Sequence, residues 1–320
     1  MVNSPTIAAR ASCDASANAR RGPGQRRRHN DDVGARGTVN KMKGPTLVIL
    51  AAGRARRYGG LKQLAPIGKH GEGVIDLLAS DAIAVGFDEI VVVINRDTGP
   101  SIRAHVAKHW PRDHRVSFAV QETLHGTVDA VLAAEPMVDP ATPFGVSNAD
   151  DIYGLDALRK LNHHLTTSTS SCLIAFELEN SLVGDLPVSR GSCRVADGLL
   201  VEIVERRNVH YSSDGLAADD GLAPYFLDPQ TLVSMNLWGF QPSIWPLMHQ
   251  AMDRHDFTVS PEVLLPVFIG EVLHSGSIRF DVITTNSRCI GVTHAEDLPL
   301  AQFLVREEIK AGQRPEFAFQ

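Results

Sequence analysis

A basic loop that follows a short apolar run has the clearest chemical character in this sequence. The apolar run, residues 47–52, breaks into Gly53, then into several arginines, and reaches a single lysine at Lys62. Glycine lets the backbone approach a ligand closely, exposed N–H groups point at anionic oxygens, and the cationic side chains neutralise charge. The segment therefore indicates a polyphosphate-binding loop, with an ordinary basic surface turn as the alternative. It fits neither the GxGxxG pattern nor the Gly-Lys-Ser/Thr ending of the P-loop.

A second feature is the acidic pair Asp150-Asp151, which follows another apolar run in the stretch Ser147-Asn-Ala-Asp-Asp151. Carboxylates in such a position can hold a hard cation such as Mg²⁺ against substrate phosphates, with water as the remaining ligands. The cap of a following helix is the alternative interpretation. The stretch therefore predicts a divalent-metal site that would act together with the basic loop.

Alternating strands and helices position these residues. Strands are expected at 47–52, 89–95, 116–120 and 144–147, and helices at 73–85, 102–109, 128–134 and 155–165. This rhythm predicts a three-layer α/β/α fold, Rossmann-like, with a mixed, mostly parallel sheet. Gly53, Gln121 and the acidic pair then follow three strands at the carboxyl edge, where such sheets bind ligands. Further short strands are expected at 171–177, 195–196, 199–204, 233–239 and 278–284, with a long loop at 208–229 and a closing helix at 301–311.

The charge distribution separates the N-terminal segment from the rest. Residues 1–43 hold nine Lys and Arg against three Asp and have no apolar periodicity, so we expect disorder there. A dispensable tail, a misplaced start or a transit peptide would each explain that segment. The remaining residues carry 22 basic and 34 acidic side chains, which argues against a nucleic-acid partner. No apolar run is long enough to span a membrane, and four scattered cysteines indicate reduced thiols and a cytoplasmic location.

The loop sequence resembles the signature L-A-A-G-x-G-[ST]-R, followed by a lysine, of bacterial sugar-1-phosphate nucleotidyltransferases, and is most similar to an uncharacterised branch. The resemblance implies that the backbone of Leu50-Ala51-Ala52-Gly53 binds the triphosphate. It assigns the outer phosphates to Arg57 and the region near the reacting phosphorus to Lys62. Ala55 and Arg56 depart from the signature, which has a glycine and a small hydroxyl residue there.

The same resemblance implies roles for the two other strand ends. Gln121 with Gly126 and Thr127 would hold the nucleotide base, although Gly126-Thr127 could also simply start a helix. Asp150 would bind Mg²⁺, with Asp151 as the alternative. A second metal carboxylate is expected from a D-[TI]-G-T segment, but this chain has Gly291 there, so Asp297 is the nearby candidate.

The acceptor side is less similar to the family. Gly191 and the pair Glu205-Arg206 correspond to a glycine turn and a V-E-K-P segment that bind the sugar and its phosphate, and Asn236 would reach a hydroxyl or a phosphate. Arginine in place of lysine exchanges a point charge for a planar fork. The missing proline and this exchange leave the identity of the acceptor open.

The sequence therefore predicts residues 44–320 to be one nucleotidyltransferase domain, with a nucleotide half at about 44–154 and an acceptor half at about 155–320. The expected reaction transfers an NMP group from an NTP to a sugar 1-phosphate, with Mg²⁺ as cofactor. A transferase for a polyol or choline phosphate and a catalytically silent nucleotide-binding regulator are the alternatives. The base, the acceptor and the oligomeric state, a homo-oligomer included, stay open.

Overall fold

The computed structural model describes residues 44–53, 60–292 and 294–319. The chain divides into two units, residues 1–41 and residues 42–320. The predicted disorder of residues 1–43 and the predicted role of Arg57 lie outside the described residues.

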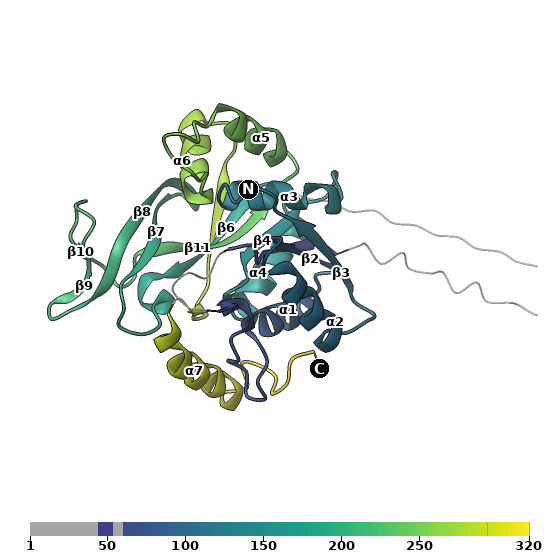
Figure 1. The fold of residues 1–320 in the computed structure, drawn as a ribbon. Helices are drawn as coiled ribbons and strands as arrows, with labels where there is room; N and C mark the ends of the chain where they lie inside the picture. The colour runs from purple at the N-terminus through teal and green to yellow at the C-terminus, as the bar shows by residue number, and fades with distance from the viewer. Residues whose placement is uncertain (1–43, 54–59, 293, 320) are drawn as a thin grey trace, which may run out of the picture. The chain divides into compact units, whose positions relative to one another are not determined.

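Strands and helices alternate through the first half of the described chain, as the sequence predicts (Figure 1). The helices are α1 (Val74–Ala84), α2 (Gly99–His109), α3 (Thr127–Ala134), α4 (Leu155–Thr167), α5 (Ile244–Arg254), α6 (Leu265–Ser275) and α7 (Leu298–Lys310). The strands are β1 (Thr46–Leu50), β2 (Glu89–Ile94), β3 (Arg115–Val120), β4 (Phe144–Asn148), β5 (Asp151–Ile152), β6 (Ser171–Glu177), β7 (Val188–Ala196), β8 (Leu199–Ser212), β9 (Gly215–Ala218), β10 (Phe226–Leu227), β11 (Leu232–Phe240), β12 (Phe280–Thr284) and β13 (Ile290–Gly291). Short 3-10 turns are η1 (Lys62–Leu64), η2 (Glu135–Met137), η3 (Leu178–Ser181) and η4 (Ala295–Asp297).

One large mixed sheet runs in the order β10-β9-β8-β12-β6-β11-β4-β1-β2-β3, and β7 pairs with both β8 and β11. The predicted mixed α/β fold is confirmed. Parallel pairing holds in the segment β4-β1-β2-β3 and between β6 and β12. Most of the other pairs in the described sheet are antiparallel, so the expectation of a mostly parallel sheet is correct only for the N-terminal half.

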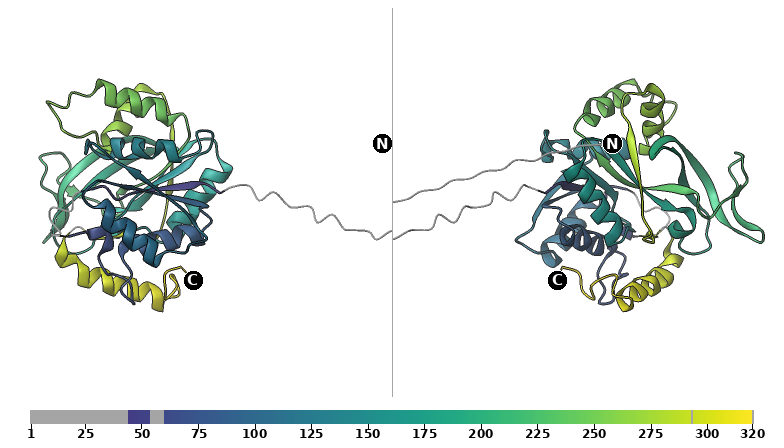
Figure 2. Two further views of the ribbon diagram at one scale, coloured as in Figure 1. Left: turned by 45° about the vertical axis from the view of Figure 1, so that its right-hand side comes forward. Right: turned by 180° about the vertical axis from the view of Figure 1, so that it is seen from behind.

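Two apolar cores lie on opposite faces of this sheet, because alternate side chains of a strand point to opposite faces. Leu47 and Ile49 of β1 pack in the core with α1, α2 and α4, whereas Val48 and Leu50 pack in the core with α3, α5 and α6. Figure 2 shows the blue helices α1 and α2 on one side of the sheet and the green helices α5 and α6 on the other. The central strands therefore have no wet face, and only their ends are open to ligands.

The second half contains elements that the sequence analysis missed. The expected loop at 208–229 holds the end of β8 together with β9 and β10, and helices α5 and α6 were not predicted at all. Strand β8 is much longer than expected because it pairs with β7 along one part and with β9 along another. Among the described helices, none combines the length and apolar character that crossing a bilayer requires.

Candidate nucleotidyl-transfer site

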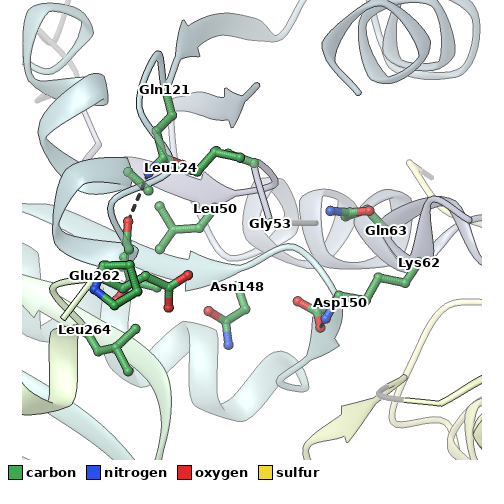
Figure 3. Close-up of a pocket in the computed structure, with 15 residues that line it drawn as sticks. Leu50, Gly53, Lys62, Gln63, Gln121, Leu124, Asn148, Asp150, Glu262 and Leu264 are labelled. Carbon is green, nitrogen blue, oxygen red and sulfur yellow. Dashed lines mark hydrogen bonds and ion pairs between the residues drawn. The ribbon is translucent and has the colours of Figure 1, made fainter. Parts of the chain in front are cut away.

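The strand ends singled out in the sequence meet at one edge of the sheet. Leu50 at the end of β1 is in register with Asn148 at the end of β4, and the Gln121 N–H donates to the Ile94 carbonyl at the end of β2 (2.8 Å). Leu50, Gly53, Gln121, Asn148 and other residues around them line a cavity of about 640 Å³ (Figure 3). Parallel pairing brings these carboxyl ends together, which is the reason that distant motifs share a site.

The walls of this nucleotide cavity are apolar on one side. Leu50, Leu124 and Leu264 line it together with Ala130, and such surfaces suit the flat faces of a base. Leu264 belongs, with Pro261 and Glu262, to the segment that leads into α6. The sequence analysis missed this wall because nothing in the local pattern connects residues 261–264 with a loop more than 130 positions earlier.

Gln121 is held in one orientation by its own loop. Its Nε2 donates to the Gly126 carbonyl (3.0 Å) and to the Asp129 carboxylate (2.7 Å). Because both amide hydrogens are used within the loop, the side chain can offer its carbonyl oxygen as an acceptor to the cavity. Figure 3 shows Gln121 beside Leu124 on the wall opposite Glu262.

His125 and Thr127 connect the loop before α3 to the segment before α6. The Val263 N–H donates to the His125 carbonyl (2.8 Å), and the Leu265 N–H donates to the Thr127 hydroxyl (2.7 Å). Thr127 does begin α3, but this hydroxyl accepts from Leu265 and does not cap its own helix. Gly126 and Thr127 both line the cavity, so helix start and cavity wall coexist here.

We expect Gly126→Ala to lower the free energy of unfolding by at least about 1–3 kcal/mol, because its backbone would be strained in the left-handed region. Gly126 has φ +98°, and a Cβ there would lie 2.6 Å from the Val263 carbonyl oxygen. Urea unfolding measures the loss. Gly198→Ala is the matched control. Gly198 has φ +75°, but a Cβ added there would lie in open space. Equal losses in the two variants would show that the close approach to Val263 carries no cost.

The loop backbone is only partly available to a phosphate. The Ala51 N–H continues the sheet by donating to Val93 (2.8 Å), and the Ala51 carbonyl accepts from Gln63 (3.0 Å). Ala51 also lies outside the cavity lining, so its expected contact with the triphosphate has no support from this geometry. Ala52, whose carbonyl accepts from Asn95 (2.6 Å), and the exposed Gly53 do line the cavity.

Lys62 and Asp150 form an ion pair across the cavity. The Lys62 ammonium contacts the Asp150 carboxylate directly, although the two residues are 88 positions apart (Figure 3). Both side chains are partly exposed and line the cavity, so a ligand can reach them. A cation and a carboxylate at the same point can neutralise an incoming phosphate and hold its counter-ion.

Asp151 lies behind Asp150 in a nearly dry environment. Its carboxylate accepts from the Asn148 amide (2.9 Å), and burial raises its pKa, with a further increase from the charge of Asp150. Gly291 lies opposite Asp151 in the pairing of β5 with β13, and a Cβ on Gly291 would lie 2.3 Å from the Asp151 carboxylate. Asp151 thus fills the space that a side chain at position 291 would need.

The carboxylates present fit Mg²⁺ as a substrate-bridging ion. Within the described part of the chain, no cluster of three or more His, Cys, Asp or Glu side chains could hold a metal by itself. Mg²⁺ commonly needs only one or two carboxylates beside waters and substrate phosphates. Asp150, which reaches the cavity, and Asp151 next to it can supply that number.

The structure does not support Asp297 as a second metal ligand. Asp297 is buried, its carboxylate accepts from the His294 N–H (2.7 Å), and it lies outside the linings of the nucleotide cavity and of the second cavity described next. The reason is local: Asp297 closes the turn η4 that leads into α7. Although residues 291 and 297 are close in the sequence, Asp297 does not reach either cavity.

A second cavity, of about 310 Å³, adjoins the first. Gly191, Glu205 and Asn236, which the sequence analysis assigns to the acceptor, all line it. Asn148 and Asp150 line both cavities. Two ligands could therefore meet at Asp150, one from each cavity.

The backbone explains how Asn236 reaches this cavity. Strand β11 is irregular between Ser234 and Trp238 in its pairing with β6, and Asn236 has φ +59°. Asparagine tolerates the left-handed region better than most residues, and such irregularities redirect side chains near active sites. On the opposite wall, burial raises the pKa of Glu205.

Arg206 is placed elsewhere, contrary to the expectation that it holds the acceptor. Its guanidinium is buried and pairs with Asp220 (2.6 and 3.1 Å), and it also donates to the carbonyls of Leu222 and Pro224. It lies outside the linings of both cavities. Arg206 thus fastens the segment between β9 and β10 to β8. This partner could not be anticipated from a stretch expected to be a loop.

Arg190 is the arginine that lines the second cavity, and the sequence analysis did not single it out. It lies directly opposite Arg206 in the pairing of β7 with β8. It directly precedes Gly191, the residue that the sequence analysis singled out from the expected glycine turn. The signal available was a cation next to that glycine.

Comparisons with known proteins agree with this geometry. Residues 47–197 match the model of the MobA-like NTP transferase domain. This range includes β1, the basic loop, Gln121 and the acidic pair. No curated protein has a significant sequence match to the chain.

Solved structures show the same fold at low identity. The inositol-1-phosphate CTP transferase from T. maritima is similar with a TM-score of 0.61 and 13% identity, over 84% of this chain and 98% of that one. A UDP-glucose pyrophosphorylase complexed with UDP-glucose is similar with a TM-score of 0.59 and 15% identity, over 82% of this chain and 99% of that one.

Proposed function

We propose that this chain transfers the NMP group of an NTP to a sugar 1-phosphate. Residues 47–197 match the MobA-like NTP transferase domain, and the chain is an enzyme of the nucleotidyltransferase type. The products would be pyrophosphate and an NDP-sugar. The observation that carries this proposal is that Asp150 lines both cavities and forms an ion pair with Lys62.

The proposed chemistry is a displacement at the α-phosphorus of the NTP. A phosphate oxygen of the acceptor forms the new P–O bond, the bond to the β-phosphate bridging oxygen breaks, and pyrophosphate leaves with the electron pair. The attacking phosphate is already anionic, so the protein has to position two polyanions and neutralise their repulsion. Lys62 would lie against the α-phosphate, and Arg57 is proposed for the leaving pyrophosphate.

Mg²⁺ is the proposed cofactor, and it would supply charge neutralisation between the phosphates. Asp150 would hold it, with Asp151 as a second carboxylate. Leu50, Gln121, Gly126 and Thr127 would bind the base and Gly53 the triphosphate. Gly191, Glu205 and Asn236 would bind the acceptor. The cytoplasm is the proposed location, supported by the described cysteines, Cys172, Cys193 and Cys289, being free thiols.

A polyol phosphate is the second candidate acceptor. Arg206 belongs to the expected sugar-binding pair, but it forms an ion pair with Asp220. Of that pair, only Glu205 lines the acceptor cavity, so the cavity differs from the expectation for a sugar. One of the similar structures is an inositol-1-phosphate CTP transferase, and a polyol phosphate is therefore included in the test.

Pyrophosphate release tests the proposal. The full chain with Mg²⁺ is incubated with each of four NTPs and a panel of sugar 1-phosphates and polyol phosphates. Turnover with one pair names the base and the acceptor together. If every pair is silent while an NTP still raises the thermal unfolding midpoint, the transferase proposal is wrong and a nucleotide-binding regulator takes its place.

A further inference from the structure

We propose that Arg190 binds the phosphate of the acceptor and makes the second cavity selective for phosphomonoesters. The inference rests on the proposed function and deepens it, because it names the residue that recognises the acceptor's charge. Arg206 of the expected Glu205-Arg206 pair does not supply this cation, because it lies outside the linings of both cavities.

Position is the first argument. Arg190 lines the acceptor cavity together with Asp150, Asp151 and Glu205. Three carboxylates around an open space would repel an anionic acceptor. A cation within the same lining is therefore needed before a phosphomonoester can enter, and Arg190 is the arginine that the described lining contains.

The hydrogen bonds of Arg190 are the second argument. Its Nε donates to the Ser181 hydroxyl (3.1 Å), one terminal nitrogen donates to the Ser189 carbonyl (2.7 Å) and the other to the Ser181 carbonyl (2.5 Å). A guanidinium has five N–H groups, so these three bonds leave two for a ligand. The partners that fix it are neutral, so its charge is held in place without being cancelled by a direct partner.

Environment is the third argument. The side chain is half-buried against Ser181 of η3, and this burial lowers its pKa while the carboxylates Asp151 and Glu205 favour its charged form. Arginine stays charged in such surroundings, where a lysine would lose its proton more easily. A planar fork held by two serines also suits the two oxygens of a phosphate better than a mobile ammonium does.

The arrangement places the acceptor's phosphate beside the reacting centre. Asp150 lines both cavities, and Arg190 lines the second. A phosphate bound by Arg190 would therefore lie on the second-cavity side of Asp150. That is the side from which an acceptor oxygen has to approach the α-phosphorus.

Steady-state kinetics with the NTP and acceptor pair found in the grid is the main test. Arg190→Gln is expected to raise KM for the acceptor about 10–100-fold, the effect of losing hydrogen bonds to a charged group, with KM for the NTP unchanged within twofold. Arg190→Lys should recover part of the loss, since it keeps the charge and loses the fork.

Arg194→Gln is the matched control. Arg194 is on the same strand, is 65% exposed, and pairs with Glu202 (2.9 Å) away from the cavity. It should leave both KM values unchanged. The proposal is overturned if Arg190→Gln changes both KM values equally, or if it lowers only the thermal midpoint.

A binding measurement separates failure of this inference from failure of the proposed function. If the wild-type protein turns over no pair, titration calorimetry with inorganic phosphate still reports on the cation. Loss of one phosphate-binding event in Arg190→Gln, but not in Arg194→Gln, supports the assignment. Identical phosphate titrations in both variants overturn it.

Discussion

Replacing Lys62 by alanine is expected to lower kcat of nucleotidyl transfer about 10²–10³-fold while the protein stays folded. Lys62 contacts the Asp150 carboxylate, which lines both cavities, and the proposed reaction would bring the negative charge of both substrates to this place. The pair is partly exposed, so breaking it costs the fold only about 0–1 kcal/mol. Initial rates of pyrophosphate release and thermal unfolding measure the two effects.

Asp150→Ala should lose activity to a similar degree but for a different reason. The substitution removes the proposed Mg²⁺ ligand, so the variant should need a higher Mg²⁺ concentration to reach its residual rate. In Lys62→Ala, the Mg²⁺ concentration that the rate requires should stay at the wild-type value. The double variant should be little worse than either single variant, because residues that act as a unit are not additive.

Lys69→Ala is the control for charge alone. Lys69 pairs with Glu316 on the surface and lies outside the two cavities. It should retain the wild-type rate. Full activity in Lys62→Ala, or an equal loss in Lys69→Ala, would contradict the assigned site.

Sequence reasoning succeeded where function depends on strand ends. Gly53, Gln121 and Asp150 each follow an apolar run, and parallel pairing alone brings the ends of such runs to one edge. No long-range information is needed for that step. The cavity that these residues line therefore follows from local patterns and one topological rule.

Sequence reasoning failed where a side chain's partner comes from a distant or unpredicted element. Arg206 was assigned to the acceptor, but its partner Asp220 lies in a segment expected to be a loop. Asp297 was assigned to the metal by its proximity to Gly291. Its carboxylate instead accepts a hydrogen bond from the His294 N–H in the turn before α7, and it lies outside the linings of both cavities. The spacing of residues in the sequence identifies candidate site residues. Whether a charged candidate reaches the site depends on the other groups in the folded structure that can pair with it.

Arg206→Ala is expected to lower the free energy of unfolding by about 3–5 kcal/mol, because it leaves a buried carboxylate without its partner. Both side chains are almost fully buried, at 5% and 3% exposure, and two nitrogens of Arg206 bind Asp220. Urea unfolding at pH 7 measures the loss. The exposed pair Arg194–Glu202 is the control, since breaking it should cost at most about 1 kcal/mol.

The pH dependence of that loss identifies its cause. The hydrogen bond from Arg206 holds the pKa of Asp220 below its ordinary value, so the pair stabilises the fold at neutral pH and loses this contribution as pH falls toward the folded-state pKa. In Arg206→Ala, protonation of the buried Asp220 removes its unpaired charge, so lowering the pH should recover part of the lost stability. The difference between wild type and variant should therefore shrink from pH 7 to pH 4. A difference that stays constant over this range would mean that lost packing around the arginine stem, and not the unpaired carboxylate, causes the destabilisation.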